Sequence, residues 1–154
     1  MESPRIMVNI ISAVYWFDDA LQSRLRQEGV EPVTRPQSLL IANLSAGALR
    51  PSQLAKNLGV SRQAISQMLV ELEARGLIVI ENDPMDRRAK IVKFQERGVG
   101  ARILNELEDE LAERIGHSNV EALRRALLAD WGPSPVVVNE EDAIQNDKDI
   151  CKES

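Results

Sequence analysis

The stretch of residues 51–94 constrains the fold of this chain more than any other, because residues that typically begin or end a helix occur in it at regular intervals. Pro51 suits the first turn of a helix, and Gly59 can adopt the left-handed conformation that ends one. Ser61 is a favourable N-cap for a second helix, which we expect to run to about Arg75 and to end at Gly76. Two short helices are therefore joined by a tight turn.

Two β-branched segments follow these helices. Residues 77–80 and 90–94 are short and contain β-branched residues, and the polar residues 81–89 between them contain a proline. This pattern predicts a β-hairpin with a long, exposed loop. The order helix, turn, helix, hairpin is that of a winged helix-turn-helix.

The predicted turn between the two helices has a composition that suits close packing. Ala55 is small where the helices must approach each other, and four apolar side chains of the second helix recur at helical spacing. We expect those four to pack on the first helix: Ile65, Met68, Leu69 and Leu72.

The opposite face of the second helix has the composition of a DNA-contacting surface. It carries one arginine and several short or amide side chains but no acid: Arg62, Gln63, Ser66, Gln67 and Val70. Arginine can bind guanine through two hydrogen bonds, and glutamine can bind adenine. We predict that Arg62, Gln63, Ser66 and Gln67 face base edges; the alternative is an ordinary solvated helix face.

The hairpin loop offers a second charged surface. Arg87 and Arg88 lie near its expected tip, and we predict that both bind DNA, with Arg88 entering the narrow minor groove. Asp86 is expected to brace the loop by pairing with one of these arginines. Phosphate contacts are predicted for Ser52, Ser61 and Lys90. The alternative is a mobile, solvated charge cluster.

The charge distribution permits this function although the whole chain is acidic. The 154 residues carry a net charge of −5, but the last 22 contain six acids and two lysines. Residues 50–98 contain nine basic and six acidic side chains. A local basic surface can bind phosphates because the field acts mainly within a Debye length of about 8 Å.

Long amphipathic helices are predicted on both sides of this lobe. Apolar residues at spacings of three and four indicate helices over residues 7–28, 36–46, 96–115 and 118–131. The fold class is therefore mainly α with a small β-hairpin, a winged helix-turn-helix with long N- and C-terminal dimerisation helices.

The expected domain organisation is one domain and a tail. The domain covers residues 1–132, with a DNA-binding lobe at 36–98, and residues 133–154 form an acidic tail that we expect to be disordered. Helices 7–28 and 99–131 present more apolar surface than the lobe can cover, so we expect them to pack against a second copy of the chain.

The stretch 51–98 resembles the MarR family of bacterial regulators. The resemblance rests on Gln53-Leu54-Ala55, Leu58-Gly59-Val60-Ser61, Leu72–Leu77 and Asp86-Arg87-Arg88. Arg50 departs from it, standing where a Ser or Thr cap is usual, and Phe94-Gln95 replaces the usual Leu-Thr. The resemblance implies an obligate homodimer on a pseudo-palindromic operator, a repressor more than an activator, and release from DNA by a small aromatic or anionic effector.

The resemblance also suggests where an effector would bind, between the dimerisation helices and the DNA-binding lobe. Tyr15, Trp16 and Phe17 lie on the first helix near that junction and include three of the five aromatic residues. We predict that they line an effector pocket. The alternative assigns these side chains to the dimer core.

Other function classes find little support in the sequence. With one histidine, His117, and one cysteine, Cys151, the chain lacks the ligands for a metal cluster and the groups for Cys–His or Ser–His–Asp catalysis. We therefore expect no enzyme activity, no cofactor and no metal. No apolar run approaches the roughly 20 residues that span a bilayer, and no secretory signal is evident, so a reducing cytoplasm is expected.

One alternative function remains open at this stage. A winged helix can serve as a protein–protein interaction module, an adaptor or antirepressor without DNA binding, and the acidic net charge is compatible with it. Replacing Arg62, Gln63 and Arg88 by alanine separates the two functions, because only a DNA-binding protein would lose DNA affinity.

Overall fold

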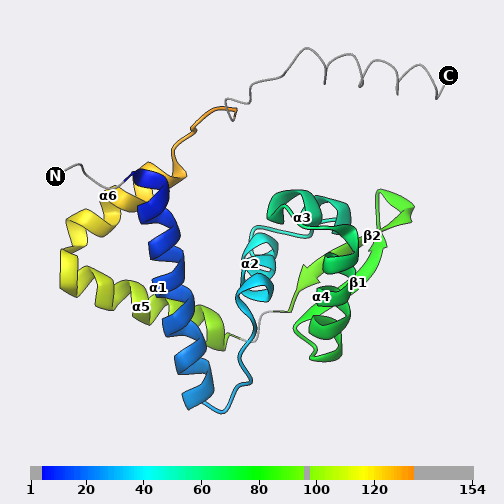
Figure 1. Cartoon of the computed structure of the whole chain (residues 1–154), viewed down its shortest axis with the longest axis horizontal. Helices are drawn as coiled ribbons and strands as arrows, with labels where there is room; N and C mark the ends of the chain where they lie inside the picture. Colours follow the sequence, from blue (N-terminus) through cyan, green and yellow to red (C-terminus); the bar gives the residue numbers. More distant parts are fainter. Residues whose placement is uncertain (1–4, 96–97, 134–154) are drawn as a thin grey trace.

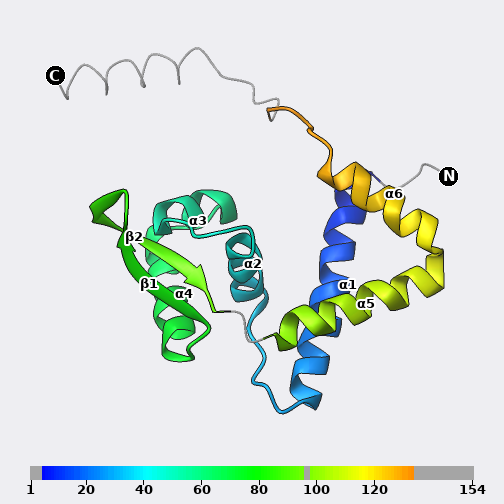
Figure 2. The same cartoon turned by 180° about the vertical axis from the view of Figure 1, so that it is seen from behind.

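A computed structural model describes residues 5–95 and 98–133 of the chain (Figure 1). Within them the element order is α1 (Ile6–Gln27), α2 (Arg35–Leu44), α3 (Pro51–Leu58), α4 (Arg62–Ala74), β1 (Ile78–Asp83), β2 (Asp86–Phe94), α5 (Val99–Ile115) and α6 (His117–Leu128). Figures 1 and 2 show α1, α5 and α6 on one side and α2, α3, α4 and the hairpin on the other. The predicted fold class is confirmed.

The core of the winged-helix lobe lies between α2, α3, α4 and the hairpin. Its buried side chains are Leu40, Leu44, Leu54, Ala55, Ile65, Leu69, Leu72, Ile78 and Val92. The four apolar residues predicted on the inner face of α4 all contribute, with Met68 at the edge of the cluster. Gly59 adopts a φ of +64° at the end of α3, which lets the backbone N–H of Val60 donate to the carbonyl of Ala55 at 3.1 Å.

The hairpin differs from its prediction. The strands pair antiparallel from Ile78 opposite Phe94 to Asn82 opposite Lys90, and a bulge precedes Asp83. The turn is therefore short, at Pro84 and Met85, and the expected long loop over residues 81–89 is wrong. Near the turn the two strands consist of polar residues that are largely exposed to solvent. Backbone hydrogen bonds can pair such residues without a buried face, so this part of the sequence shows no alternation of apolar and polar residues from which strands could be predicted.

A backbone contact attaches the hairpin to the rest of the lobe. Leu49, just before α3, exchanges two hydrogen bonds with Val92 of β2: its N–H donates at 3.1 Å and its carbonyl accepts at 2.8 Å. The base of the ribbon is thereby fixed beside the first helix of the helix-turn-helix.

Most helix limits agree with the expected ones to within two residues. The α2 helix begins one residue early because Thr34 and Gln37 form a reciprocal capping box, and it ends at Leu44. The α6 helix ends at Leu128 because Ala129 is extended, so Trp131 lies beyond it and the predicted end at 131 is wrong. The predicted start of α5 at residue 96, and almost all of the predicted tail, fall outside the described residues.

The second unit is an open arrangement in which α5 packs on both α1 and α6. Its buried side chains are few, chiefly Ile103 and Leu107 of α5. Apolar side chains at the ends of the helices are instead solvated, with Met7 72% and Leu128 79% exposed. None of the helices in the part of the chain that the structure describes is long and apolar enough to cross a membrane.

A small polar network joins this unit to the winged-helix lobe. The side chain of Gln22 donates to Asp18 at 3.1 Å, and its carbonyl accepts from the backbone N–H of Val33 at 2.9 Å. Arg35, the first residue of α2, pairs with Asp18 at 3.1 Å. Since Asp18 and Gln22 are buried, this network fixes the connection between α1 and α2.

Candidate nucleic-acid interface

The outer face of α4 carries the predicted base-contacting residues together. Arg62, Gln63, Ser66 and Gln67 are all exposed, and Val70 extends the same face with 67% of its surface accessible. The opposite face of the helix is buried in the core of the lobe. The helix is therefore held rigidly from behind while its first turns present polar side chains to solvent.

Local hydrogen bonds shape the start of this face. The Ser61 hydroxyl oxygen accepts from the backbone N–H of Ala64 at 3.1 Å, as expected of an N-cap, and its own proton remains available to a phosphate. Ser66 donates to the Arg62 carbonyl at 3.0 Å, and Gln67 donates to Glu71 one turn further along at 3.4 Å. Acidic side chains thus begin only in the later turns of α4.

The hairpin turn places its charged residues differently from the prediction. Pro84 and Met85 form the tip, and Arg87 and Arg88 follow it as exposed residues of β2. Asp86 pairs with neither guanidinium. One of its carboxylate oxygens accepts from the backbone N–H of Arg88 at 3.1 Å, and the other lies 4.0 Å from Arg50.

The sequence analysis missed Asp83, which holds the turn together. Its Oδ1 accepts from the backbone N–H of Met85 at 2.9 Å, and its Oδ2 accepts from Nε and Nη2 of Arg50 at 2.9 and 2.6 Å. The Met85 N–H, followed by the Arg50 guanidinium, lowers the pKa of Asp83 below its ordinary value. The available signals were an Asp-Pro step before the turn and an arginine at a cap position.

Several basic groups on this side of the lobe are not neutralised. Lys56, Arg62, Arg87 and Arg88 form no ion pair within residues 5–95 and 98–133. Lys90 donates to Asn82 at 2.7 Å, which leaves two ammonium protons for another acceptor. Ser52 is exposed in the first turn of α3. The arrangement can bind a polyanion along α3, α4 and the hairpin.

A large apolar groove lies between the two units. Its volume is about 1170 Å³, and its walls come mainly from α1, α2 and α5, with Phe17, Leu21 and Leu39 among the apolar lining residues. Of the three aromatic residues predicted to line an effector pocket, the groove has only Phe17. Tyr15 instead stacks under the Arg35 guanidinium at 4.3 Å, and Trp16 contacts Phe17 edge-on with ring centroids 4.9 Å apart.

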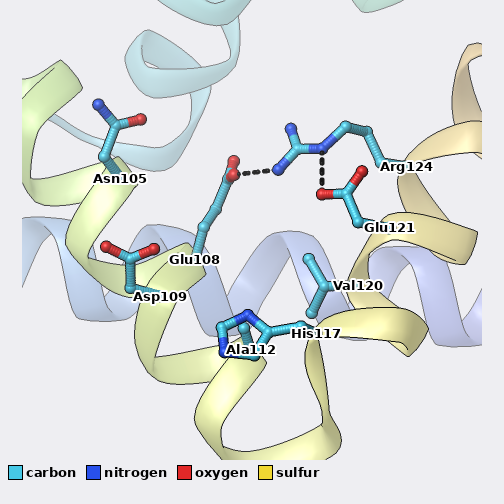
Figure 3. Close-up of a pocket in the computed structure, with 8 residues that line it drawn as sticks. All are labelled: Asn105, Glu108, Asp109, Ala112, His117, Val120, Glu121 and Arg124. Carbon is cyan, nitrogen blue, oxygen red and sulfur yellow. Dashed lines mark hydrogen bonds and ion pairs between the residues drawn. The ribbon is translucent and has the colours of Figure 1, made fainter.

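A smaller hollow of about 230 Å³ lies between α5 and α6 and contains His117 (Figure 3). The two glutamates beside it are engaged by Arg124, which lies 2.6 Å from Glu108 and 3.4 Å from Glu121. These ion pairs raise the pKa of Arg124, first through the hydrogen bond to Glu108. The pair with Glu108 therefore links α5 to α6, whereas the pair with Glu121 lies within α6.

Comparison with known proteins identifies the same fold. A sequence model described as the MarR family matches residues 31–89. The transcriptional regulator PA4135 is 22% identical over 85% of this chain and 100% of its own, with a TM-score of 0.64. NadR in complex with 4-hydroxyphenylacetate is 22% identical over 82% and 92%, with a TM-score of 0.61. The reduced form of MarR from E. coli is 23% identical over 84% and 100%, with a TM-score of 0.55.

The family consists of DNA-binding transcriptional regulators and not of enzymes. Its model covers the connection before α2, the helix-turn-helix and the start of β2, and the similar structures extend the likeness to the flanking helices. The resemblance expected from the sequence is confirmed: a MarR family model matches residues 31–89, and the described chain has the same winged-helix fold as these solved regulators.

Proposed function

We propose that this protein represses transcription by binding a pseudo-palindromic operator in double-stranded DNA as a homodimer. The observation that carries the proposal is the outer face of α4, where Arg62 and three short or amide side chains are exposed without a neutralising acid in the first turns. Such a face fits the major groove, where base edges offer donors and acceptors in distinct patterns.

The proposed contacts follow from the placement of the side chains. Arg62, Gln63, Ser66 and Gln67 contact base edges. Phosphates are bound by Ser52 and Ser61, near the starts of α3 and α4, and by Lys90 of the hairpin. Arg87 and Arg88 approach the minor groove beside the turn, where a narrow groove concentrates negative potential.

Dimerisation is supported by the unsatisfied apolar surface of the helical unit. Met7 of α1 and Leu123, Leu127 and Leu128 of α6 are exposed although they lie on amphipathic helices. A second copy covering these side chains removes them from water and places two α4 helices on one duplex. Their spacing must then match successive major grooves, about 34 Å apart.

The groove between the units is the proposed site of a small aromatic or anionic effector. Because α1 supplies Phe17 and Asp18 while α2 supplies Leu39 and Ala42, an occupant contacts both units at once. It can therefore shift the winged-helix lobe relative to the dimerisation helices and change the spacing of the two α4 helices. The 4-hydroxyphenylacetate bound by NadR supports the choice of a phenolic acid as the first probe.

Selection of bound fragments from genomic DNA, followed by fluorescence anisotropy at low ionic strength without effector, tests the proposal. Arg62→Ala should weaken binding to the selected site by about 1–3 kcal/mol and relax its sequence preference. Arg26→Ala is the matched control, because Arg26 is an exposed arginine on α1, away from the proposed contacts.

Two results would count against DNA binding. One is a wild-type protein that ignores genomic DNA at low salt. The other is an Arg62→Ala variant that binds as tightly as the Arg26→Ala control. Either result would favour a winged helix used for protein–protein interaction.

A further inference from the structure

We propose that Arg50 is a positioning residue for the wing: by pairing with Asp83 it fixes the hairpin turn against the start of α3, and so sets where Arg88 meets the duplex. The inference rests on the proposed function and deepens it, because it assigns a role in DNA binding to a side chain that need not touch DNA.

The geometry of the pair is that of a fixed link. The Arg50 guanidinium donates twice to the same oxygen of Asp83, at 2.9 and 2.6 Å, while the other oxygen holds the Met85 N–H at 2.9 Å. Asp83 is 7% exposed, so this carboxylate has little access to water. One carboxylate thus connects α3 to the apex of the hairpin across 33 residues of sequence.

Arg50 occupies the N-cap position of α3 yet does not cap the helix. Its side chain makes no hydrogen bond to the first-turn amides, although Ser, Thr, Asp and Asn are the residues that normally supply one. The side chain is directed to the hairpin instead. An arginine at this position therefore forgoes a local capping bond and forms a long-range one.

The outer half of the ribbon needs such a link. The backbone exchange between Leu49 and Val92 anchors the ribbon near its base, whereas Arg87 and Arg88 lie four or more residues closer to the turn. An isolated two-stranded ribbon is only marginally stable in water. With Asp83 held, the arginines are ordered before binding, and less conformational entropy is lost when they contact DNA.

Amide hydrogen exchange in the free protein tests the ordering step without DNA. Arg50→Thr supplies a residue that can cap α3, so the helix should persist while protection of the Met85 amide falls several-fold. Arg50→Lys keeps the charge without the double hydrogen bond and should give intermediate protection. Unchanged Met85 protection in Arg50→Thr would overturn the proposal.

Operator affinity then separates positioning from simple electrostatics. Removing the negative charge of Asp83 near DNA should tighten binding if only charge matters. Positioning predicts the opposite sign: Asp83→Asn should bind roughly three- to tenfold more weakly, because the turn must be ordered on binding. Glu81→Gln is the matched control, since Glu81 is an exposed acid of the same hairpin that pairs with Lys93 at 2.6 Å. Tighter binding by Asp83→Asn would refute the idea.

A double-mutant cycle with Arg88→Ala completes the design. If Arg50 acts through the wing, Arg50→Thr should cost affinity in the wild-type background and little in the Arg88→Ala background. Equal losses in both backgrounds would mean that Arg50 contacts a phosphate directly, and the inference would fail. If the wild-type protein binds no DNA, the proposed function fails by itself, whereas the exchange measurement still decides whether Arg50 orders the turn.

Discussion

Truncation of Ile65 tests which face of α4 is packed in the core of the lobe and which face is exposed to solvent. Ile65 is 1% exposed in the core of the lobe, so Ile65→Ala removes three carbons that are fully shielded from water. At about 0.8 kcal/mol for each buried carbon the transfer term is about 2.4 kcal/mol. The cavity left behind adds about 1 kcal/mol, which gives a loss of about 3–4 kcal/mol in the free energy of unfolding.

Val70→Ala on the same helix is the matched control. Val70 is 67% exposed, so its truncation removes side-chain atoms that are already largely hydrated. The free energy of unfolding should change by no more than about 0.5 kcal/mol. Operator affinity should nevertheless fall if Val70 contacts a thymine methyl group at the edge of the α4 surface.

Urea unfolding followed by circular dichroism provides the measurement. All variants are compared at one protein concentration, because the stability of an oligomer depends on concentration. A loss below about 1 kcal/mol for Ile65→Ala, or equal losses for the two variants, would contradict the assignment of the faces. The proposed DNA contacts of the outer face would then lose their structural basis.

Three further predictions concern the wing, the groove and the dimer. Because the pKa of Asp83 is lowered on folding, its carboxylate stabilises the fold above its ordinary pKa of 3.8, and this contribution is lost as pH falls through the lowered value. The difference in urea stability between wild type and Asp83→Asn should therefore be constant near neutral pH and shrink in strong acid. If the groove is the effector site proposed above, Phe17→Ala should weaken binding of a phenolic acid in a fluorescence titration while Tyr15→Ala has little effect, since Phe17 lines the groove and Tyr15 does not; equal effects would contradict this placement. Leu128→Glu should shift sedimentation toward a species of 17.2 kDa, whereas a wild-type protein already of that mass would refute dimerisation.

Local signals were sufficient to predict the helices of the lobe. Ser61 and Gly59 mark helix limits through short-range hydrogen bonds and backbone conformation, so their effects are visible in the sequence itself. The inner face of α4 was predictable for the same reason, because its apolar residues recur at helical spacing. The outer face consists of the remaining positions of the helix, so it was predictable from the same spacing.

The wing and the groove were less predictable because their determinants are not periodic. The polar ends of β1 and β2 show no alternation. The sequence therefore predicted a long loop where the strands in fact continue, through a bulge before Asp83, to a short turn at Pro84 and Met85. In the first helix, adjacent residues point about 100° apart, and three consecutive aromatic side chains therefore cannot share one wall. The structure accordingly places Phe17 in the groove and Tyr15 against Arg35.

The sequence alone determined the order of elements and the two faces of α4, because each depends on residues within a few positions of one another. Only the tertiary structure decided that Arg50 binds Asp83 and that Asp18 joins α1 to Arg35. Such pairs depend on how distant segments meet when the core packs. One charged side chain is compatible with many partners until the fold brings a particular one within hydrogen-bonding distance.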